Sequence, residues 1–339
     1  MIVRLASEIF DIESSRNDLS YLIQTIVRHG HSIQADKATI TDTSWMSQTD
    51  SEILDQAAIA SVIGNQSSPD CEVIRDASDI HSQKKFDIKE AIDYTSQPLE
   101  VILENGTNDA QIVHAVIRSY TAANAKARDA YYNHYLTFGT GGGCGNIKTY
   151  IQGKLAQHQD RSKFLRYYVI LDGDRRFPTH SVKKHDKLID YLTEISVKHH
   201  VFEKRCMENY LPVECFPGKE SNTTWINAFK ALSAVQRDFF NISGGFRGDI
   251  PDCDKPKILP DGSNIRRLLP AEQQTFYSDV STANFNTLSK GYQLKSFKSS
   301  FPKGYEDGKV NTATLNAIQA HQANPSELAE IARDIESLL

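Results

Sequence analysis

The sequence has no apolar run that approaches the ~20 residues a helix needs to cross a bilayer. Its first residues, MIVRLASEIFDIESS, lack the long apolar core of a secretory signal. No pair among its five cysteines has CxxC spacing, and an odd number without such pairs is typical of a reducing compartment. These absences predict a cytoplasmic protein without a membrane partner.

An excess of basic residues is also missing, since 38 Lys and Arg stand against 43 Asp and Glu for a formal charge of −5. A general basic nucleic-acid coat is therefore excluded, and any contact with nucleic acid requires a local basic patch or bound metal ions. The remaining composition is that of an average globular protein, with 40% hydrophobic residues over 339 positions. This length predicts about two domains.

Residues 1–95 are expected to form a helix-rich N-terminal module without a chemical motif. Apolar residues at helical spacing precede Gly30, and a second helix is predicted from Glu52 to Ile63, ending at Gly64. A short strand is expected between them, near residues 37–41.

Residues 96–212 alternate short apolar runs with helical patterns of 10–16 residues. Strands are predicted at Leu99–Leu103, His134–Phe138, Tyr167–Leu171 and Lys198–Phe202. Such alternation indicates βαβ crossovers and an α/β fold with a doubly wound parallel sheet flanked by helices. Sheets of this kind place ligands beyond the carboxyl ends of their strands. After Pro212 the alternation stops, and residues 213–339 are expected to be mostly helical.

Acidic residues follow three of these predicted strands. Glu104 ends the first strand and Asp109 opens the next helix, Asp172 and Asp174 follow the third, and Glu208 follows the fourth. In a parallel sheet these positions meet on one rim. Hard carboxylate oxygens suit Mg²⁺ or Mn²⁺ rather than zinc. Two such ions about 3.5–4 Å apart can activate water for phosphodiester hydrolysis.

Simpler interpretations stand beside this one. A single DGD is more often a turn, a glutamate at a strand end is usually solvated, and the glycine-rich run at 139–145 is typical of a loop. Within that run, Cys144 has no base beside it in the sequence, so no role is predicted for it. The order of all these features along one alternating segment favours the metal site.

A basic and aromatic stretch, KSFKSSFPKGY at 295–305, allows two interpretations. Its Phe297, Phe301 and Tyr305 could stack on nucleic-acid bases while Lys298 and its neighbours contact phosphates. Alternatively, the aromatic rings anchor a solvated loop to the core, which is the more common outcome for loops.

Four motifs stand out together between Pro98 and Pro212: PLEVILENGTNDAQIV, FGTGGGCGNI, YYVILDGDRR and EKRCMENYLP. They resemble the Toprim domain of the overcoming-lysogenization-defect (OLD) nucleases and related bacterial defence nucleases. The resemblance covers about a third of the chain. It implies a Toprim domain at 96–212, a metal-dependent endonuclease that cleaves DNA or RNA with Mg²⁺ or Mn²⁺, and a role as effector of antiphage defence.

The resemblance also implies residue roles and a partner. Glu104 matches the family's metal-binding general base, and Asp172 and Asp174 match its paired metal ligands. Lys204 or Arg205 matches its basic transition-state residue. A separate ATPase of the ABC/SMC kind is implied as regulator, because the chain has no P-loop of its own. Self-association into a homo-oligomer is compatible with this arrangement.

One departure from the family pattern leaves an alternative open. Many Toprim domains have glycine directly after the glutamate and an acidic residue four positions later, whereas here Asn105 intervenes and Asp109 comes five positions after Glu104. A shift by one residue exchanges the faces of a strand, so Asn105 could occupy the rim. Independently of this shift, the resemblance implies that Glu208 orients the basic residue or adds a ligand.

The alternative is a catalytically weakened Toprim module that docks to a partner ATPase or to nucleic acid. A nucleotidyl transferase or primase-like enzyme, which also uses acidic metal sites, is a third interpretation. It ranks last because no separate nucleotide-binding element is visible in the sequence.

Overall fold

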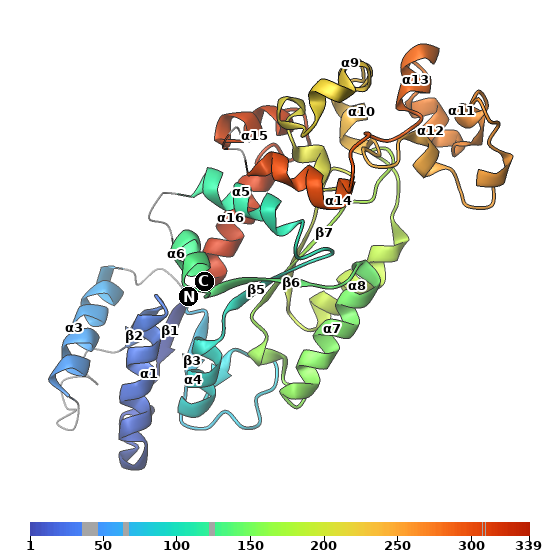
Figure 1. The fold of residues 1–339 in the computed structure, drawn as a ribbon. Helices are drawn as coiled ribbons and strands as arrows, with labels where there is room; N and C mark the ends of the chain where they lie inside the picture. Colours follow the sequence, from blue (N-terminus) through green and yellow to red (C-terminus); the bar gives the residue numbers. More distant parts are fainter. Residues whose placement is uncertain (36–46, 64–67, 122–125, 307, 309) are drawn as a thin grey trace.

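The computed structural model describes all residues except 36–46, 64–67, 122–125, 307 and 309. The strand expected near residues 37–41 lies outside the described residues. Within them the fold is α/β, with two parallel four-stranded sheets and helices on both (Figure 1). None of the helices found in the described ranges is both long and apolar enough to cross a membrane.

The N-terminal module contains a sheet that the sequence did not reveal. Its strands are β1 (Ile2–Leu5), β2 (Ser32–Ala35), β3 (Cys71–Val73) and β4 (Lys85–Phe86), in the order β2-β1-β3-β4. The sequence predicted helices and one short strand in this module, but not a four-stranded sheet. The reason is strand length, because runs of two to four residues are too short to show an apolar pattern.

Three helices accompany this first sheet: α1 (Arg16–Arg28), α3 (Gln48–Ile63) and α4 (Ile88–Ser96). α1 buries the apolar stripe of Leu19, Leu22, Ile23 and Ile26, as its helical spacing predicts. The helix predicted from residue 52 is α3, which begins four residues earlier. The module thus has its own apolar core.

The second sheet has the strands that the sequence predicts, with small shifts at the ends. They are β5 (Leu99–Leu103), β6 (Leu136–Thr140), β7 (Tyr167–Leu171) and β8 (Lys198–Val201), in the order β6-β5-β7-β8. All neighbouring pairs are parallel. Between the strands run α5 (Ala110–Tyr120), α6 (Lys126–Tyr132), α7 (Cys144–Gln157) and α8 (Lys183–Glu194).

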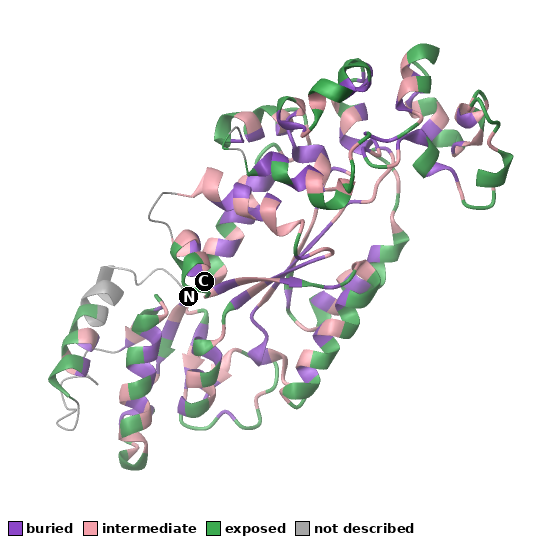
Figure 2. Cartoon of the chain, viewed as in Figure 1, coloured by how far each residue is buried: buried purple, intermediate pink, exposed green. Residues whose placement is uncertain are grey.

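Most residues of the central strands of this sheet are buried, as the colours of Figure 2 show. Val101 and Tyr168 belong to a core shared with α5 and the C-terminal helices, while Ile102 and Val169 pack toward α7 and α8. Apolar side chains on both faces are what a parallel sheet covered by helices requires.

Residues 213–339 form helices and turns, with no strand among those described. The helices are α9 (Thr223–Lys230), α10 (Ala234–Phe239), α11 (Ile265–Leu268), α12 (Ala271–Phe276), α13 (Thr282–Leu288), α14 (Phe297–Ser300), α15 (Thr312–Gln319) and α16 (Glu327–Leu338). A single helix expected from Trp225 to Phe240 is instead two helices. The first ends at Lys230, and Ser233 caps the second through a capping box with Gln236.

The C-terminal region is an integral part of the second unit. α16 packs along α5, and its Leu328, Ile331 and Ile335 are buried in the same core as β5 and β7. The chain therefore closes over one face of the sheet and brings residues beyond 290 back to its carboxyl edge (Figure 1).

Candidate metal centre at the carboxyl edge of the second sheet

A cavity of about 440 Å³ opens at the carboxyl edge of the second sheet, and four carboxylates line it. Glu104 follows β5, Asp109 precedes α5, Asp172 follows β7, and Glu208 lies in the 3₁₀ turn that comes after β8. The structure therefore brings together four of the five acidic residues that the sequence places on this rim. Asn105, Asn108 and Thr140 add neutral oxygen atoms to the same wall.

The carboxylates raise one another's proton affinity. Burial raises the pKa of Asp172 well above its usual value, and Glu208, Glu104 and Asp109 add to the effect. Burial also raises the pKa of Asp109 to about 7, with further contributions from Glu208 and Glu104. The pKa of Glu104 rises for the same first reason, helped by the charge of Asp174. Such clustering of like charges is relieved by protons or by a cation.

Two close backbone contacts fix the position of Asp172. A Cβ atom on Gly173 would lie 2.2 Å from the carbonyl oxygen of Lys204 and 2.5 Å from that of Phe202, so only glycine lets the segment after β7 run this close to the segment after β8. The backbone N–H of Met207 then donates to Oδ1 of Asp172 over 3.0 Å. Glu208 is the next residue, which explains why it reaches the same cavity.

The glycine-rich turn after β6 holds the backbone at Glu104. Gly141 N–H donates to the carbonyl of Leu103 over 2.9 Å, and Gly143 N–H donates to that of Glu104 over 3.0 Å. Gly142 and Gly143 have φ angles of 67° and 97°, which favour glycine. The loop character predicted for this run is therefore present, and the loop has a positioning role.

The inserted Asn105 does not displace Glu104 from the cavity, because both residues line it. The backbone N–H of Asn105 donates to Oδ2 of Asp109 over 2.9 Å, and its carbonyl accepts from the N–H of Asp109 at the same distance. The extra residue is thus absorbed in a turn that ties Asp109 to the strand end.

Asp174, the fifth predicted ligand, does not line this cavity. Its φ angle of 53° turns the side chain toward the start of α8, where it pairs with Lys184 and lies 3.3 Å from Nε2 of His185. Burial alone would raise the pKa of Asp174, but the contacts with His185 and Lys184 hold it below its usual value. The predicted pair of Asp172 and Asp174 is therefore split between two environments.

Lys204 and Arg205 do not face the cavity as predicted. Lys204 is buried, with Nζ 2.7 Å from Oδ1 of Asp238 and donating to the carbonyl of Ile318 over 2.8 Å. Arg205 binds both carboxylate oxygens of Asp249, at 2.6 and 2.9 Å. The sequence could not show this, because both acidic partners come from the C-terminal region.

A different basic residue lies at the cavity wall. Lys298, the second residue of α14, is exposed and lines the cavity with the carboxylates. Phe301 and Tyr305 are buried and so are not available for stacking on bases, and the Tyr305 hydroxyl donates to the carbonyl of Met207 over 2.8 Å. Phe297 is partly buried and stacks on Phe301. The aromatic rings therefore anchor this segment, which is two short helices rather than a loop.

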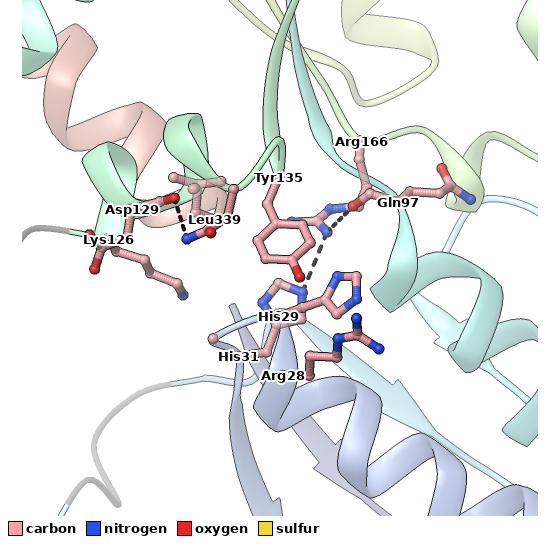
Figure 3. A pocket seen from close by; sticks show the side chains of 12 residues that line it. Arg28, His29, His31, Gln97, Lys126, Asp129, Tyr135, Arg166 and Leu339 are labelled. Atoms are coloured by element: carbon pink, nitrogen blue, oxygen red, sulfur yellow. Dashed lines mark hydrogen bonds between the residues drawn. The ribbon is translucent and has the colours of Figure 1, made fainter.

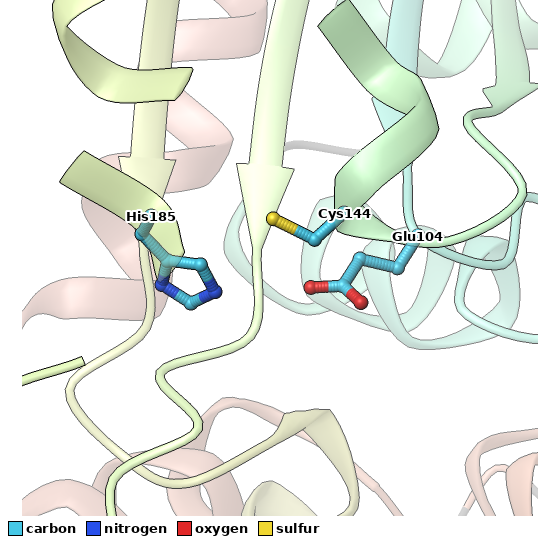
Figure 4. Close-up of side chains that lie close together, drawn as sticks. All are labelled: Glu104, Cys144 and His185. Carbon is cyan, nitrogen blue, oxygen red and sulfur yellow. The ribbon is translucent and has the colours of Figure 1, made fainter. Parts of the chain in front are cut away.

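Glu104 also belongs to a second group of side chains. One potential ligand atom each from Glu104, Cys144 and His185 lies within 4.8 Å of the others, and the three side chains point toward one another (Figure 4). No local pattern in the sequence indicates this group, because His185 stands 41 positions after Cys144. The packing of α8 beside α7 brings the two residues together.

A further cavity, of about 160 Å³, lies at the opposite edge of the same sheet (Figure 3). Of the residues that line it, Tyr135 and Arg166 directly precede β6 and β7, and Gln97 stands two residues before β5. Arg166 donates to the carbonyls of Gln97 over 2.6 Å and of Leu338 over 3.1 Å, and it lies 3.5 Å from Nε2 of His31 in the first unit, so it connects the two units and the C-terminus. The presence of Arg166 in this cavity is therefore explained by its structural contacts.

In comparisons with known proteins, no family model, no curated protein and no solved structure matches this chain.

Proposed function

We propose that this chain is a Toprim-type nuclease that hydrolyses phosphodiester bonds of DNA or RNA with Mg²⁺ or Mn²⁺. One observation supports the proposal above the others. Four carboxylates from three separate segments, namely Glu104 with Asp109, Asp172, and Glu208, line a single cavity at the edge where parallel sheets bind ligands. Three of the four Toprim-like motifs supply these segments, and the fourth supplies the glycine turn beside them.

The residues present fit a hard divalent cation. All the donors in the cavity are oxygen atoms of carboxylates, amides and a hydroxyl, which Mg²⁺ and Mn²⁺ prefer. One carboxylate oxygen, Oε1 of Glu104, is shielded from solvent and accepts no hydrogen bond. Glu104, Asp109, Asp172 and Glu208 would hold the ion, which when bound supplies a Lewis acid for phosphodiester hydrolysis.

The protein's own groups would share the remaining tasks. Glu104 lines the cavity and is placed to accept a proton from water there. Lys298 offers the positive charge that a phosphate group would meet at the cavity wall. Lys204 and Arg205 instead keep the segment that carries Glu208 in place.

The Toprim resemblance extends the proposal to a biological role, as effector of an antiphage defence system controlled by a separate ABC/SMC-type ATPase. The chain has no P-loop sequence, so a nucleotide-dependent trigger would have to come from a partner. The net charge of −5 is compatible with this, since nucleic acid would be attracted through the metal ions and local lysines rather than by the whole surface.

One observation favours the alternative of a catalytically weakened binding module. The two basic residues that resemble the family's transition-state group are both engaged in internal ion pairs. In that case the fold would serve to dock a partner ATPase or nucleic acid. Calorimetry with Mn²⁺ separates the two functions, because the binding module predicts no heat of binding at millimolar metal.

Cleavage of DNA and RNA by the purified chain with Mn²⁺, alone and with any ATPase encoded beside it, tests the proposed activity. We expect Asp172→Asn to abolish cleavage, while the exposed Asp252→Asn control leaves it unchanged. Equal cleavage by the Asp172→Asn variant in a clean preparation would refute the site. Absence of both cleavage and Mn²⁺ binding in the wild type would favour the binding module.

A further inference from the structure

The second group around Glu104 contains the ligand types of a different metal. Cys144 is the first residue of α7, His185 lies in the first turn of α8, and Glu104 follows β5. Their ligand atoms lie within 4.8 Å of one another, as Figure 4 shows. We propose that these three side chains form a binding site for a zinc-class transition-metal ion.

Unsatisfied polar atoms support the site independently of the ligand types. Oε1 of Glu104 and Nε2 of His185 are both shielded from solvent without a hydrogen-bond partner. The imidazole of His185 is only 3% exposed, and Oδ2 of Asp174 is the charged group nearest to its Nε2, at 3.3 Å. A buried polar atom without any partner is rare and costly, and a cation bound here would satisfy Oε1 of Glu104.

The chemistry of the donors separates this site from the carboxylate cavity. A thiolate and an imidazole select zinc-class ions, whereas the all-oxygen cavity selects Mg²⁺ or Mn²⁺. In a tetrahedral zinc site the ligand atoms are about 3.3–3.8 Å apart, given bonds of roughly 2.0–2.3 Å. The three atoms therefore need only small side-chain adjustments to close on an ion.

The three side chains do not complete the coordination of the ion, which suits reversible binding. Three protein ligands leave a fourth position for water, as in exchangeable zinc sites rather than closed structural ones. Cys144 is half-exposed, and Glu104 also lines the 440 Å³ cavity, so an ion has a path from solvent. Oδ2 of Asp174, which also pairs with Lys184, lies 3.3 Å from Nε2 of His185 and so helps to fix the position of the ring.

Glu104 belongs both to this site and to the carboxylate cavity. If the chain has the proposed function, this sharing allows the zinc-class ion to regulate it. A carboxylate bound to a zinc-class ion is withdrawn from the Mg²⁺ or Mn²⁺ cavity, so zinc would inhibit cleavage. The binding itself does not depend on any activity of the chain.

Titration of the metal-free, full-length chain with Co²⁺ tests the binding directly, because a bound thiolate produces a charge-transfer absorption band. We expect one Co²⁺ per chain with this band, and Cys144→Ser and Cys144→Ala to lack it. The control is the exposed Cys253→Ser, which should keep it. His185→Gln should weaken Co²⁺ binding at least tenfold, on the scale of losing a metal-positioning group. His199→Gln is the matched control.

The proposal is overturned if the band persists in both Cys144 variants, disappears in Cys253→Ser, or is absent from the wild type. Asp172→Asn distinguishes this result from the nuclease proposal, since it should keep the cobalt band while losing cleavage. If cleavage occurs, zinc should inhibit the wild type, and Cys144→Ser should require at least ten times more zinc for the same inhibition. Equal sensitivity of the two would overturn the regulatory consequence alone.

Discussion

The two sheets of this chain have the same strand order but very different edges. Numbered within its own unit, each sheet runs second, first, third, fourth, with all strands parallel. At the carboxyl edge of the first sheet, among the residues described there, Glu8 follows β1 and accepts a hydrogen bond from the backbone of Arg75, which follows β3. Asp87 follows β4 and caps α4. The carboxylates of Glu8 and Asp87 therefore already accept hydrogen bonds from the backbone.

At the same edge of the second sheet, four carboxylates face one cavity instead of neutralising partners. The topology therefore supplies the place for a site, but only the residues after each strand decide whether a site exists. The second edge also holds raised pKa values at Glu104, Asp109 and Asp172, which is the electrostatic strain expected of a site built for a cation.

The largest expected difference between the two edges is the loss of folding stability when a basic residue is replaced. Lys204→Met removes one of the two partners of the buried Asp238, which keeps only its contact with His321 over 2.7 Å, so we expect the free energy of unfolding to fall by about 3 kcal/mol, the lower end for a broken buried ion pair. Arg75→Met at the first edge removes an exposed contact and should cost less than ~1 kcal/mol. Denaturant unfolding of both variants measures this. A Lys204→Met variant of wild-type stability that loses only activity would show that Lys204 is catalytic after all.

The second contrast concerns metal affinity. Asp172→Asn should weaken Mn²⁺ binding by about 100-fold or more, because the variant removes a charge from the cavity and a ligand from the ion. Glu8→Gln, the corresponding change at the first edge, should leave the affinity unchanged. Isothermal titration calorimetry compares them. Equal loss in both variants would place the ion elsewhere.

A third difference is the response to pH. Because the folded pKa of Asp109 is raised to about 7, mainly by burial, its contribution to stability is fully present below its unfolded value and is lost as pH rises through 7. Asp109→Asn should therefore reduce the loss of stability of the metal-free protein between about pH 5 and 8, by about 2 kcal/mol. Thermal and denaturant unfolding without metal test this. The exposed Asp252→Asn control should keep the wild-type pH dependence.

The smallest expected effect belongs to Lys298, which is exposed at the cavity wall. Lys298→Ala should weaken binding of a nucleic-acid fragment by about 3–10-fold and lower the salt dependence by about one phosphate contact. Lys295→Ala, three residues away in the same basic stretch but outside the cavity lining, is the control. Fluorescence anisotropy at several salt concentrations gives both values. Equal effects of the two variants would indicate a diffuse basic surface.

The sequence predicted the second sheet well because its strands are apolar on both faces and separated by long helical patterns. The sequence did not predict the first sheet, because β4 has only two residues and β3 only three, which is too short for an apolar pattern. The site was predictable as far as strand ends determine it, which covers Glu104, Asp172 and Glu208. The roles of Asp174, Lys204 and Arg205 could not be predicted, because their partners lie in α8 and in the C-terminal region. These partners are too far along the sequence for a local pattern to indicate the pairing.

A crystal structure of the chain with Mn²⁺, located by its anomalous scattering, tests the central proposal most directly. The account predicts manganese inside the 440 Å³ cavity, bound by at least two of Glu104, Asp109, Asp172 and Glu208. A cavity free of manganese at millimolar concentration, or manganese bound only at another edge, would contradict it.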